Sequence, residues 1–197
     1  MKAGANCSIG AFINPLEEVP TMDKAKVNAV QPIHTGRVFE LQKENITLPN
    51  GITLDIEIIR HPGASAIVPI SIDGNVVLIR QYRHAVGGFI WEVPAGTLNK
   101  GETPLACAQR ELVEETGFSA KIFEKLGEIV PVPGYSDERI HLFLAKGLEP
   151  ARQNLDRDEL LDVHQVPFDE AIDMIKRGAI VDGKTIAGLL LAEKHRF

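Results

Sequence analysis

The sequence predicts an α/β layered domain, in which helices pack on a sheet. Strand-like segments are mixed with only a few helices, hairpin turn signals occur twice in the first half, and one helix has capping residues at both ends. Residues 33–60 are strand-like throughout and are expected to form a small, separate antiparallel sheet.

The N-terminal part is expected to contain a hairpin. Residues 46–48 and 52–54 are strand-like and flank Pro49, Asn50 and Gly51, a composition typical of a turn. Apolar residues at positions 54, 56 and 58 alternate with acidic ones, as in a half-buried strand. The expected boundaries are an irregular leader over 1–30, a β-sheet segment over 31–62 and the main domain over 63–197.

The main domain is expected to begin with a second hairpin and a long loop. Residues 66–72 and 76–82 are strand-like, and Asp73-Gly74 between them supplies a tight turn. Residues 85–103 are rich in Gly and Pro and are predicted to be a loop. The other expected elements are strands near 120–130 and 138–146, a helix from Pro167 to Gly178 and a last helix over 184–195.

The composition excludes several classes of protein. Hydrophobic residues make up 44% and charged residues 24%, both ordinary for a globular protein. No apolar run approaches the roughly 20 residues of a membrane helix, and no secretory signal is evident, so a cytoplasmic protein without a membrane partner is expected. A net charge of -6 without a Lys/Arg-rich run disfavours a nucleic-acid partner, whereas metal ions could still mediate binding of a small anion.

The helix predicted over 104–116 carries three carboxylates on one narrow face. At about 100° per residue, Glu115 lies about 40° from Glu111, and Glu114 lies about 60° from it on the other side. Such a cluster is either a solvated acidic face or a site for hard divalent cations, which prefer oxygen ligands. The preceding loop favours the cation site, because it can fold back and present the Ala95 carbonyl as a further ligand.

The segment GTLNKGETPLACAQRELVEETGF resembles the Nudix box. That box reads GX5EX7REUXEEXGU, with U apolar, and the segment agrees with it at every specified position. The resemblance implies the Nudix fold, a mixed β-sheet between helices (α/β/α), and pyrophosphohydrolase activity. The matching positions are Gly96, Glu102, Arg110, Glu111, Leu112, Glu114, Glu115, Gly117 and Phe118.

The same resemblance implies roles for individual residues. Glu111, Glu114 and Glu115 would bind Mg²⁺ together with the Ala95 carbonyl, and Mn²⁺ could substitute. The metal would polarise the diphosphate, neutralise the leaving group and lower the pKa of the attacking water. Supporting roles are implied for Gly96, Glu102, Arg110, Gly117 and Glu92, with Arg110 orienting the carboxylates.

Outside the box, the chain is similar to the ADP-ribose pyrophosphatase branch of this family. IRQYR (79–83), WEVPAG (91–96) and PVPGYSDE (131–138) carry the similarity, which extends from about residue 33 to the C-terminus. It implies hydrolysis of ADP-ribose to AMP and ribose 5-phosphate. GDP-mannose or another nucleotide sugar is an alternative substrate. A non-catalytic ADP-ribose sensor is an alternative of another class, which the complete set of box carboxylates disfavours.

Candidate substrate contacts lie on both sides of the box. Either Arg80 or Arg83, with Arg83 favoured, is expected to bind phosphate or to pair with Glu138. Both could instead be ordinary charges at a strand end, and Arg60 is a further candidate for an anion contact. Glu138 ends the proline-bearing loop and is expected to help bind metal or substrate. The candidates are Arg60, Arg80, Arg83, Pro133 and Glu138.

The resemblance also implies a general base and a partner. The base is expected from a loop late in the chain, here residues 154–160, with Glu159 as first choice and Asp158 as second; a solvated acidic loop is the alternative. The strands of residues 33–60 resemble the sheet with which members of this branch form intertwined homodimers. Two subunits would then build each adenosine pocket together.

Overall fold

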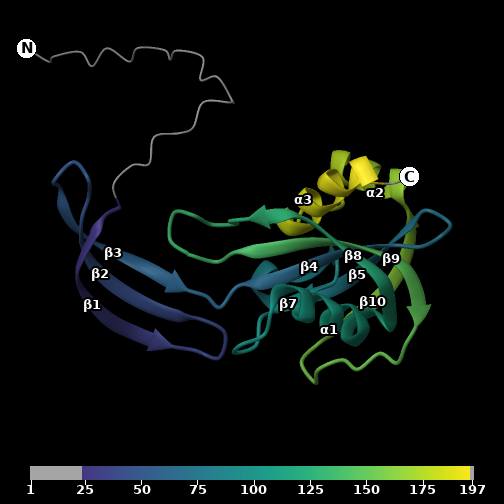
Figure 1. Ribbon diagram of the computed structural model, residues 1–197, viewed down its shortest axis with the longest axis horizontal. Helices are drawn as coiled ribbons and strands as arrows, with labels where there is room; N and C mark the ends of the chain where they lie inside the picture. The colour runs from purple at the N-terminus through teal and green to yellow at the C-terminus, as the bar shows by residue number, and fades with distance from the viewer. Residues whose placement is uncertain (1–23, 196–197) are drawn as a thin grey trace, which may run out of the picture.

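A computed structural model describes residues 24–195, which form two separate β-sheets (Figure 1). The predicted hairpin around residues 49–51 is present, because two strands of the small sheet pair along their full length on either side of it. The small N-terminal antiparallel sheet is thereby confirmed. Its strands, in spatial order, are β1 (Lys26–Thr35), β2 (Glu40–Thr47) and β3 (Thr53–Arg60).

The first strand starts earlier than predicted. β1 begins at Lys26, so the prediction of an irregular leader over residues 1–30 is wrong for residues 26–30. Residues 1–23 of that leader lie outside the described residues. Every residue of β1 is exposed, so the strand lacks the alternation of buried and exposed positions by which a sequence reveals strands. Pro32 is accommodated because β1 is an edge strand.

The large sheet has seven strands and is mixed. Its order is β10-β5-β4-β9-β8, with β6 paired to β5 and β7 paired to β4. β4 and β9 run parallel, from Ala64 opposite Ile140 to Ile70 opposite Lys146, and the other pairings recorded in this sheet are antiparallel. The strands are β4 (Ala64–Ile70), β5 (Asn75–Arg83), β6 (Gly88–Glu92), β7 (Ala95–Thr97), β8 (Phe118–Ile129), β9 (Ile140–Pro150) and β10 (Leu161–Pro167).

Helices cover both faces of the large sheet, as Figure 1 shows. Ile67 of β4 packs with Ala108 and Leu112 on one face, whereas the next residue, Val68, packs with Leu189 on the other. Because successive side chains of a strand point to opposite faces, this alternation defines an α/β/α sandwich and confirms the predicted fold class. The helices are α1 (Pro104–Thr116), α2 (Phe168–Lys176) and α3 (Gly183–Ala192), with short 3-10 turns at His84–Val86 and Glu193–His195.

Two parts of the large sheet differ from the prediction. The predicted loop over residues 85–103 contains β6 and β7, and β10 was not predicted. β6 and β7 are short, and the Gly and Pro residues in or beside them made the sequence resemble a loop. Their pairing partners β5 and β4 lie elsewhere in the sequence. No helix in the part of the chain that the structure describes is long and apolar enough to span a membrane.

Candidate active site

Helix α1 presents the box glutamates, and its two ends are fixed by caps. The Thr103 side chain accepts a hydrogen bond from the Ala106 amide at 3.2 Å, and Pro104 occupies the first turn. Gly117 ends the helix with a φ of 72°, and its amide donates to the Val113 carbonyl. Apolar Leu112 is buried on the side that faces the sheet. The capping signals of the sequence therefore set the bounds of α1 as predicted.

Arg110 holds three glutamates around its guanidinium group. It forms a bidentate pair with Glu102, with both N···O distances at 2.9 Å. Its Nη1 donates to Glu111 at 2.5 Å and to Glu114 at 2.9 Å. The Arg110 guanidinium holds the pKa of Glu102 down at about 2. Arg110 thus ties the loop before α1 to two of the clustered carboxylates.

The turn at Ala95 and Gly96 closes over the other side of the cluster. The Ala95 amide donates to Glu115 Oε2 at 2.8 Å. In a β-strand the N–H and C=O of one residue point to the same edge, so the Ala95 carbonyl also faces the α1 side rather than β4. A Cβ added at Gly96 would lie 1.8 Å from Glu111 Oε1. Gly96 is therefore required so that the Glu111 carboxylate can lie against the backbone.

Burial makes negative charge costly at this cluster. Glu111 is 7% exposed and Glu115 is 2% exposed. Burial raises the pKa of Glu115 to about 8, and burial likewise raises the pKa of Glu111. The Ala95 amide and Arg83 oppose the shift at Glu115 without cancelling it. Adding a cation would relieve this unbalanced negative charge.

The donor set fits a hard divalent cation. Glu111, Glu114, Glu115 and the Ala95 carbonyl supply only oxygen atoms, which Mg²⁺ prefers. Among residues 24–195, no three acidic, His or Cys side chains already converge in the geometry of a metal site. Arg110 and the Ala95 amide hold the carboxylate oxygens in the arrangement seen here. The identity of the metal and the ligand roles stay predictions.

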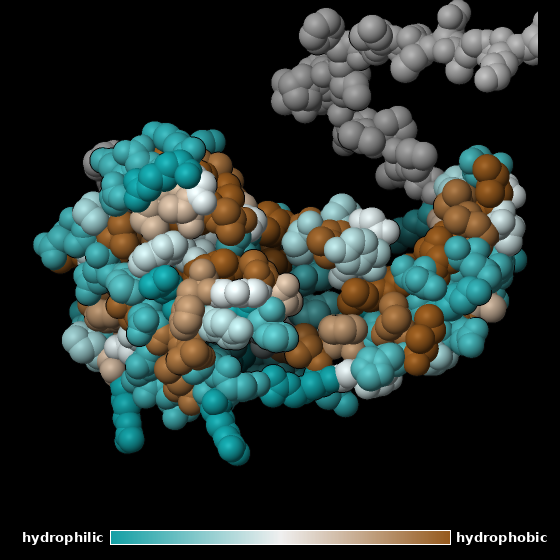
Figure 2. Space-filling model, turned by 180° about the vertical axis from the view of Figure 1, so that it is seen from behind, coloured by the Kyte–Doolittle hydropathy of each residue, from teal (hydrophilic) through white to brown (hydrophobic). Residues whose placement is uncertain are grey.

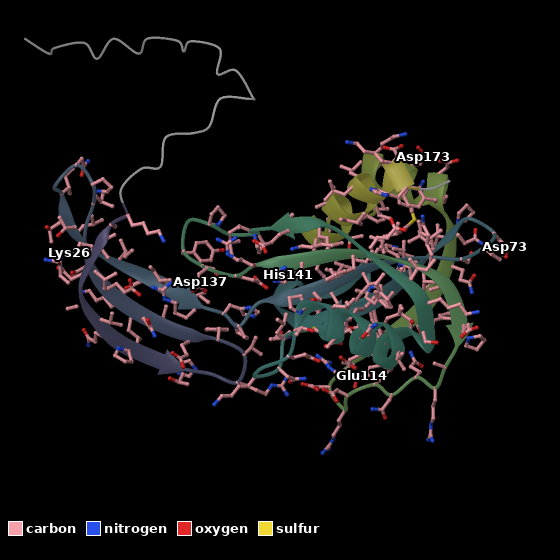
Figure 3. All side chains as sticks on the ribbon, in the orientation of Figure 1. Lys26, Asp73, Glu114, Asp137, His141 and Asp173 are labelled. Atoms are coloured by element: carbon pink, nitrogen blue, oxygen red, sulfur yellow. The ribbon has the colours of Figure 1, made fainter. Side chains whose placement is uncertain are left out.

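The loop between β9 and β10 is hydrogen-bonded to the C-terminal end of α1. The Asn154 amide donates to the Glu114 carbonyl at 3.0 Å, and Gln153 Nε2 donates to the Glu115 carbonyl at 2.6 Å. Burial is the main cause of the raised pKa of the two buried glutamates, and the nearby charge of Glu159 raises the pKa of each further. Glu159 lies in this loop, and its Oε2 accepts a hydrogen bond from the Asp156 amide at 2.7 Å. Figure 3 shows Glu114 on α1, at the side where this loop passes.

Asp158 points elsewhere. Its carboxylate pairs with Arg37 of the β1–β2 loop at 2.8 Å, and both side chains are exposed. Arg37 lowers the pKa of Asp158. Asp158 is therefore engaged away from α1, and the role of Glu159 as the base stays a prediction.

Arg83 lies next to the cluster and is held by a buried carboxylate. Its Nε and Nη2 donate to the two oxygens of Glu92, each at 2.7 Å. Burial alone would raise the pKa of Glu92, but Arg83 and Lys184 together lower it. In the described chain Arg83 therefore pairs with Glu92, whereas Glu138 lies near His61, with 3.7 Å between His61 Nδ1 and Glu138 Oε1.

The other candidates are not gathered at the cluster. Arg80 is exposed, points to the face of β5 opposite to Arg83, and stacks on Phe89 with 5.4 Å from its Cζ to the ring centroid. Arg60 is engaged by Glu44 and by Asp137, the latter at 3.0 Å. Figure 3 places Asp137 at the end of β3, away from Glu114.

The proline-bearing loop is fastened to the small sheet. The Ile59 amide donates to the Tyr135 carbonyl at 2.8 Å, and the Asp137 amide donates to the Ile59 carbonyl at 3.2 Å. Pro133, in the same loop, is exposed. Pro133 and Glu138 therefore lie at the junction of the two sheets, and their roles in substrate binding stay predictions.

One residue of this region was missed by the sequence reasoning. Lys184, on α3, lies 2.5 Å from Glu92 Oε2. A signal was available, because a lysine in the first turn of a helix opposes the helix dipole and so indicates a specific partner. The partner itself could not be found, since Glu92 lies far from Lys184 in the sequence.

Comparisons with known proteins agree with this geometry. Residues 59–189 match the NUDIX domain. The chain is 43% identical over 163 residues to a methanol dehydrogenase activator of Bacillus methanolicus, covering 82% of this chain and 88% of that protein. It is 38% identical over 162 residues to an ADP-ribose pyrophosphatase of Bacillus subtilis (strain 168), covering 81% and 88%.

More distant similarities point the same way. The chain is 33% identical over 169 residues to a GDP-mannose pyrophosphatase of Cronobacter sakazakii, covering 75% of this chain and 88% of that protein. A crystal structure of an ADP compounds hydrolase has the same fold, with a TM-score of 0.77 at 22% identity over 90% of this chain and 96% of that one. The chain therefore belongs to the Nudix family of hydrolases.

Proposed function

We propose that this chain hydrolyses ADP-ribose to AMP and ribose 5-phosphate, with Mg²⁺ as cofactor. The observation that carries the proposal is the cluster of Glu111, Glu114 and Glu115 against the Ala95–Gly96 turn. Similarity to named ADP-ribose pyrophosphatases supports the choice of substrate.

The residues of the site have different proposed roles. Glu111, Glu114, Glu115 and the Ala95 carbonyl would hold the cation. When bound, the cation supplies charge neutralisation at the diphosphate and lowers the pKa of water. Glu159 would accept the proton of the attacking water, because it lies in the loop that is hydrogen-bonded to the end of α1 and does not belong to the helix.

Arg83 is proposed to bind a phosphate oxygen of the substrate. Its side chain is 40% exposed, and in the described part of the chain its recorded hydrogen bonds use Nε and Nη2 but not Nη1. Arginine binds phosphate well because its donors form a planar fork. A role for Arg80 or Arg60 has less support, since the structure holds both away from the cluster.

The substrate is tested by product release from a panel of compounds. Wild-type protein with Mg²⁺ would be mixed with ADP-ribose, GDP-mannose, ADP-glucose, NADH and diadenosine polyphosphates, and a coupled phosphatase would report the monophosphates. ADP-ribose should give the highest kcat/KM. A preference for GDP-mannose would mean that the proposed substrate is wrong, whereas the proposed mechanism would still hold. Tight ADP-ribose binding without turnover would favour a sensor.

We also propose that the small sheet forms a homodimer interface. Apolar side chains of β1 and of the following loop are exposed in the single chain: Val27 and Val30 at 50%, Ile33 at 49%, and Val38 and Phe39 at 40%. Figure 2 shows apolar surface on this curved sheet. Isolated exposed apolar residues are ordinary, but several on one small sheet favour an interface.

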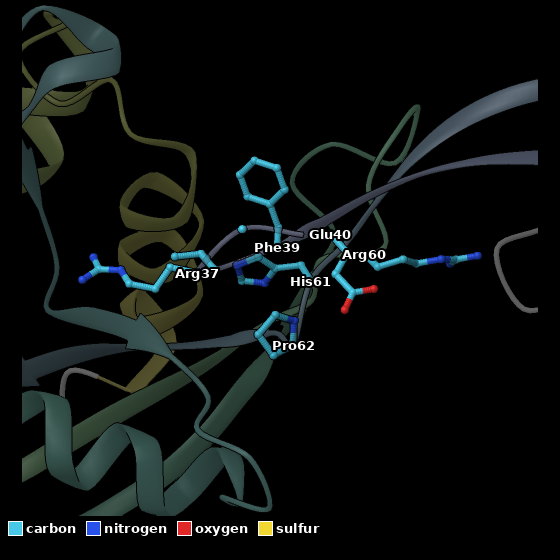
Figure 4. A pocket seen from close by; sticks show the side chains of 8 residues that line it. Arg37, Phe39, Glu40, Arg60, His61 and Pro62 are labelled. Carbon is cyan, nitrogen blue, oxygen red and sulfur yellow. The ribbon is translucent and has the colours of Figure 1, made fainter. Parts of the chain in front are cut away.

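A pocket of about 310 Å³ opens beside this surface, lined by residues 36–40 and 60–62 (Figure 4). Arg37 and Arg60 extend to opposite sides of it, with Phe39 and His61 between them. We propose that two subunits complete an adenosine pocket here.

Light scattering tests the homodimer. Wild-type protein should have twice the chain mass, and Val30→Asp with Ile33→Asp should be monomeric. Val181→Asp, at an exposed position on the other side of the chain, should remain dimeric. A monomeric wild-type protein would overturn the dimer.

A cytoplasmic location and the absence of a nucleic-acid partner also stay predictions. Cell fractionation tests the first, and a binding titration with duplex DNA and RNA at physiological salt tests the second.

A further inference from the structure

A lysine from α3 reaches into the pair formed by Arg83 and Glu92. Lys184 Nζ lies 2.5 Å from Glu92 Oε2 and 3.1 Å from Asp182 Oδ2. The Lys184 side chain is only 14% exposed, although lysine is rarely buried without a specific partner. Its position in the first turn of α3 is unfavourable for a cation, so local helix stability does not explain it.

The shared carboxylate is fully buried. The Glu92 side chain is 1% exposed, and its Oε2 accepts from both Arg83 Nη2, at 2.7 Å, and Lys184. Removing one partner from a buried ion pair is costly, because it leaves an uncompensated charge away from water. If Arg83 were the only cation paired with Glu92, its movement toward a substrate would leave the buried Glu92 carboxylate without a partner.

Arg83 faces the carboxylate cluster of α1. Leu78 of β5 packs in the same core cluster as Leu189 of α3, so the alternation of side chains along the strand puts Arg83 on the opposite face of β5, which is the face that α1 covers. The charge of Glu115 also contributes to the raised pKa of Arg83, after the hydrogen bonds to Glu92. Arg83 therefore lies between the buried Glu92 and the face where the diphosphate is proposed to bind. Arg83 can bind the substrate only if the Glu92 carboxylate keeps another cationic partner.

We propose that Lys184 is a positioning residue for substrate binding: by sharing the Glu92 carboxylate, it leaves Arg83 able to turn toward a phosphate. The inference rests on the proposed function, which puts a diphosphate beside Arg83. Lys184 itself does not touch the substrate in this account. It acts through Glu92 and Arg83.

Hydrogen bonds of the Thr185 hydroxyl join the first turn of α3 to the end of β6. The Val93 amide donates to Thr185 Oγ1 at 2.8 Å, and the Thr185 hydroxyl donates to Asp182 Oδ2 at 2.6 Å. Val93 directly follows Glu92, so the first turn of α3 is joined to the end of β6. These hydrogen bonds hold Lys184, which lies between Asp182 and Thr185 in the sequence, at a fixed position beside Glu92.

Steady-state kinetics on ADP-ribose test the proposal. Lys184→Met should raise KM roughly tenfold and change kcat by less than about threefold, because it removes binding in the ground state and the transition state alike. Lys184→Arg keeps the charge and should restore most of the lost affinity. Lys176→Met, which removes an exposed lysine paired with Asp173, should leave both constants unchanged.

A double-mutant cycle separates positioning from a merely structural role. In an Arg83→Met background, Lys184→Met should add less than about a twofold change in KM, since residues that act as a unit are not additive. An unchanged KM in Lys184→Met with only a lower melting temperature would overturn the proposal. A full tenfold rise in the Arg83→Met background would also overturn it, because Lys184 would then act directly.

A second route covers the case in which Lys184→Met does not fold. Glu92→Gln removes the buried charge that Lys184 compensates, so adding Lys184→Met to it should leave KM unchanged. A further rise in KM would contradict the proposal. Wild-type turnover on the substrate panel tests the proposed function by itself, and the ratio between variants tests Lys184 on whichever substrate is cleaved.

Discussion

Two clusters of charge lie side by side in this protein, and they differ in balance. The Arg110 cluster sets one cation against the carboxylates of Glu102, Glu111 and Glu114. The Glu92 cluster sets the two cations Arg83 and Lys184 against one buried carboxylate and the capping residue Asp182. The first has an excess of negative charge and suits a bound cation. The second is balanced, and its Arg83 is proposed to bind a phosphate oxygen of the substrate.

The two clusters also differ in how they are built. The members of the Arg110 cluster lie within residues 102–114, on one helix and the loop before it, whereas the Glu92 cluster joins residues from β5, β6 and α3. A Mg²⁺-dependent hydrolase of a diphosphate needs both, one for the metal and one for the substrate. Substitutions in each cluster should therefore have different effects.

The largest effect is expected at the base beside the first cluster. Glu159→Gln should lower kcat roughly a thousandfold, within the range for loss of a general base, because glutamine cannot accept the proton of water. The matched control is Asp158→Asn, whose carboxylate pairs with exposed Arg37, and it should change kcat by less than about twofold. Initial rates with ADP-ribose decide, and equal losses in both variants would reject the assignment of Glu159.

A backbone change tests how tightly the first cluster is fixed. Gly96→Ala should lower kcat roughly a hundredfold, because the added Cβ displaces Glu111 and a misplacement of about 1 Å costs that much. The contact at issue is a Cβ 1.8 Å from Glu111 Oε1. Gly183→Ala, where a Cβ meets nothing within 4 Å, is the control and should keep full activity. Normal kcat in Gly96→Ala would mean that Glu111 is not held at the turn.

The Glu102–Arg110 pair should show itself in the pH dependence of stability. The folded protein holds the pKa of Glu102 at about 2, below its ordinary value of 4.5. Its contribution is therefore present in full above pH 4.5 and is lost as the pH falls toward 2. The difference in free energy of unfolding between wild type and Glu102→Gln should shrink over that range in denaturant titrations. For Glu149→Gln, in an exposed pair with Lys121, little change is expected. A difference for Glu102→Gln that stays constant with pH would contradict the account.

The smallest effect is expected at the N-cap of α1. Thr103→Ala should cost about 1 kcal/mol of unfolding free energy, because the Ala106 amide loses its acceptor. Thr103→Ser keeps the hydroxyl and should retain most of the stability. Chemical denaturation of the three proteins measures both, and an undiminished stability in Thr103→Ala would show that the cap is dispensable.

Features of the fold that depend on adjacent residues were predicted from the sequence, whereas features that depend on distant residues were missed. Thr103, Pro104 and Gly117 predicted the bounds of α1, because capping depends on a few adjacent residues. β1 was missed since none of its residues is buried. β10 was missed too, and its pairing with β5 depends on a strand about eighty residues earlier in the chain.

The site divides in the same way. Glu111, Glu114 and Glu115 were predicted from spacing along one helix, and Gly96 was predicted from the box, although only the structure shows why a side chain there is excluded. The pairing of Arg83 with Glu92 and Lys184 was not predicted, because no rule of spacing connects three separate elements.

The most direct test of the central claim is Mg²⁺-dependent ADP-ribose hydrolysis by wild type and Glu115→Gln. A chelator should abolish wild-type turnover, and added Mg²⁺ should restore it. Glu115→Gln should lose turnover on the order of a thousandfold, with an unchanged circular dichroism spectrum. Near-normal turnover in that folded variant, or wild-type turnover that survives the chelator, would contradict the assignment of the carboxylate cluster as the metal site.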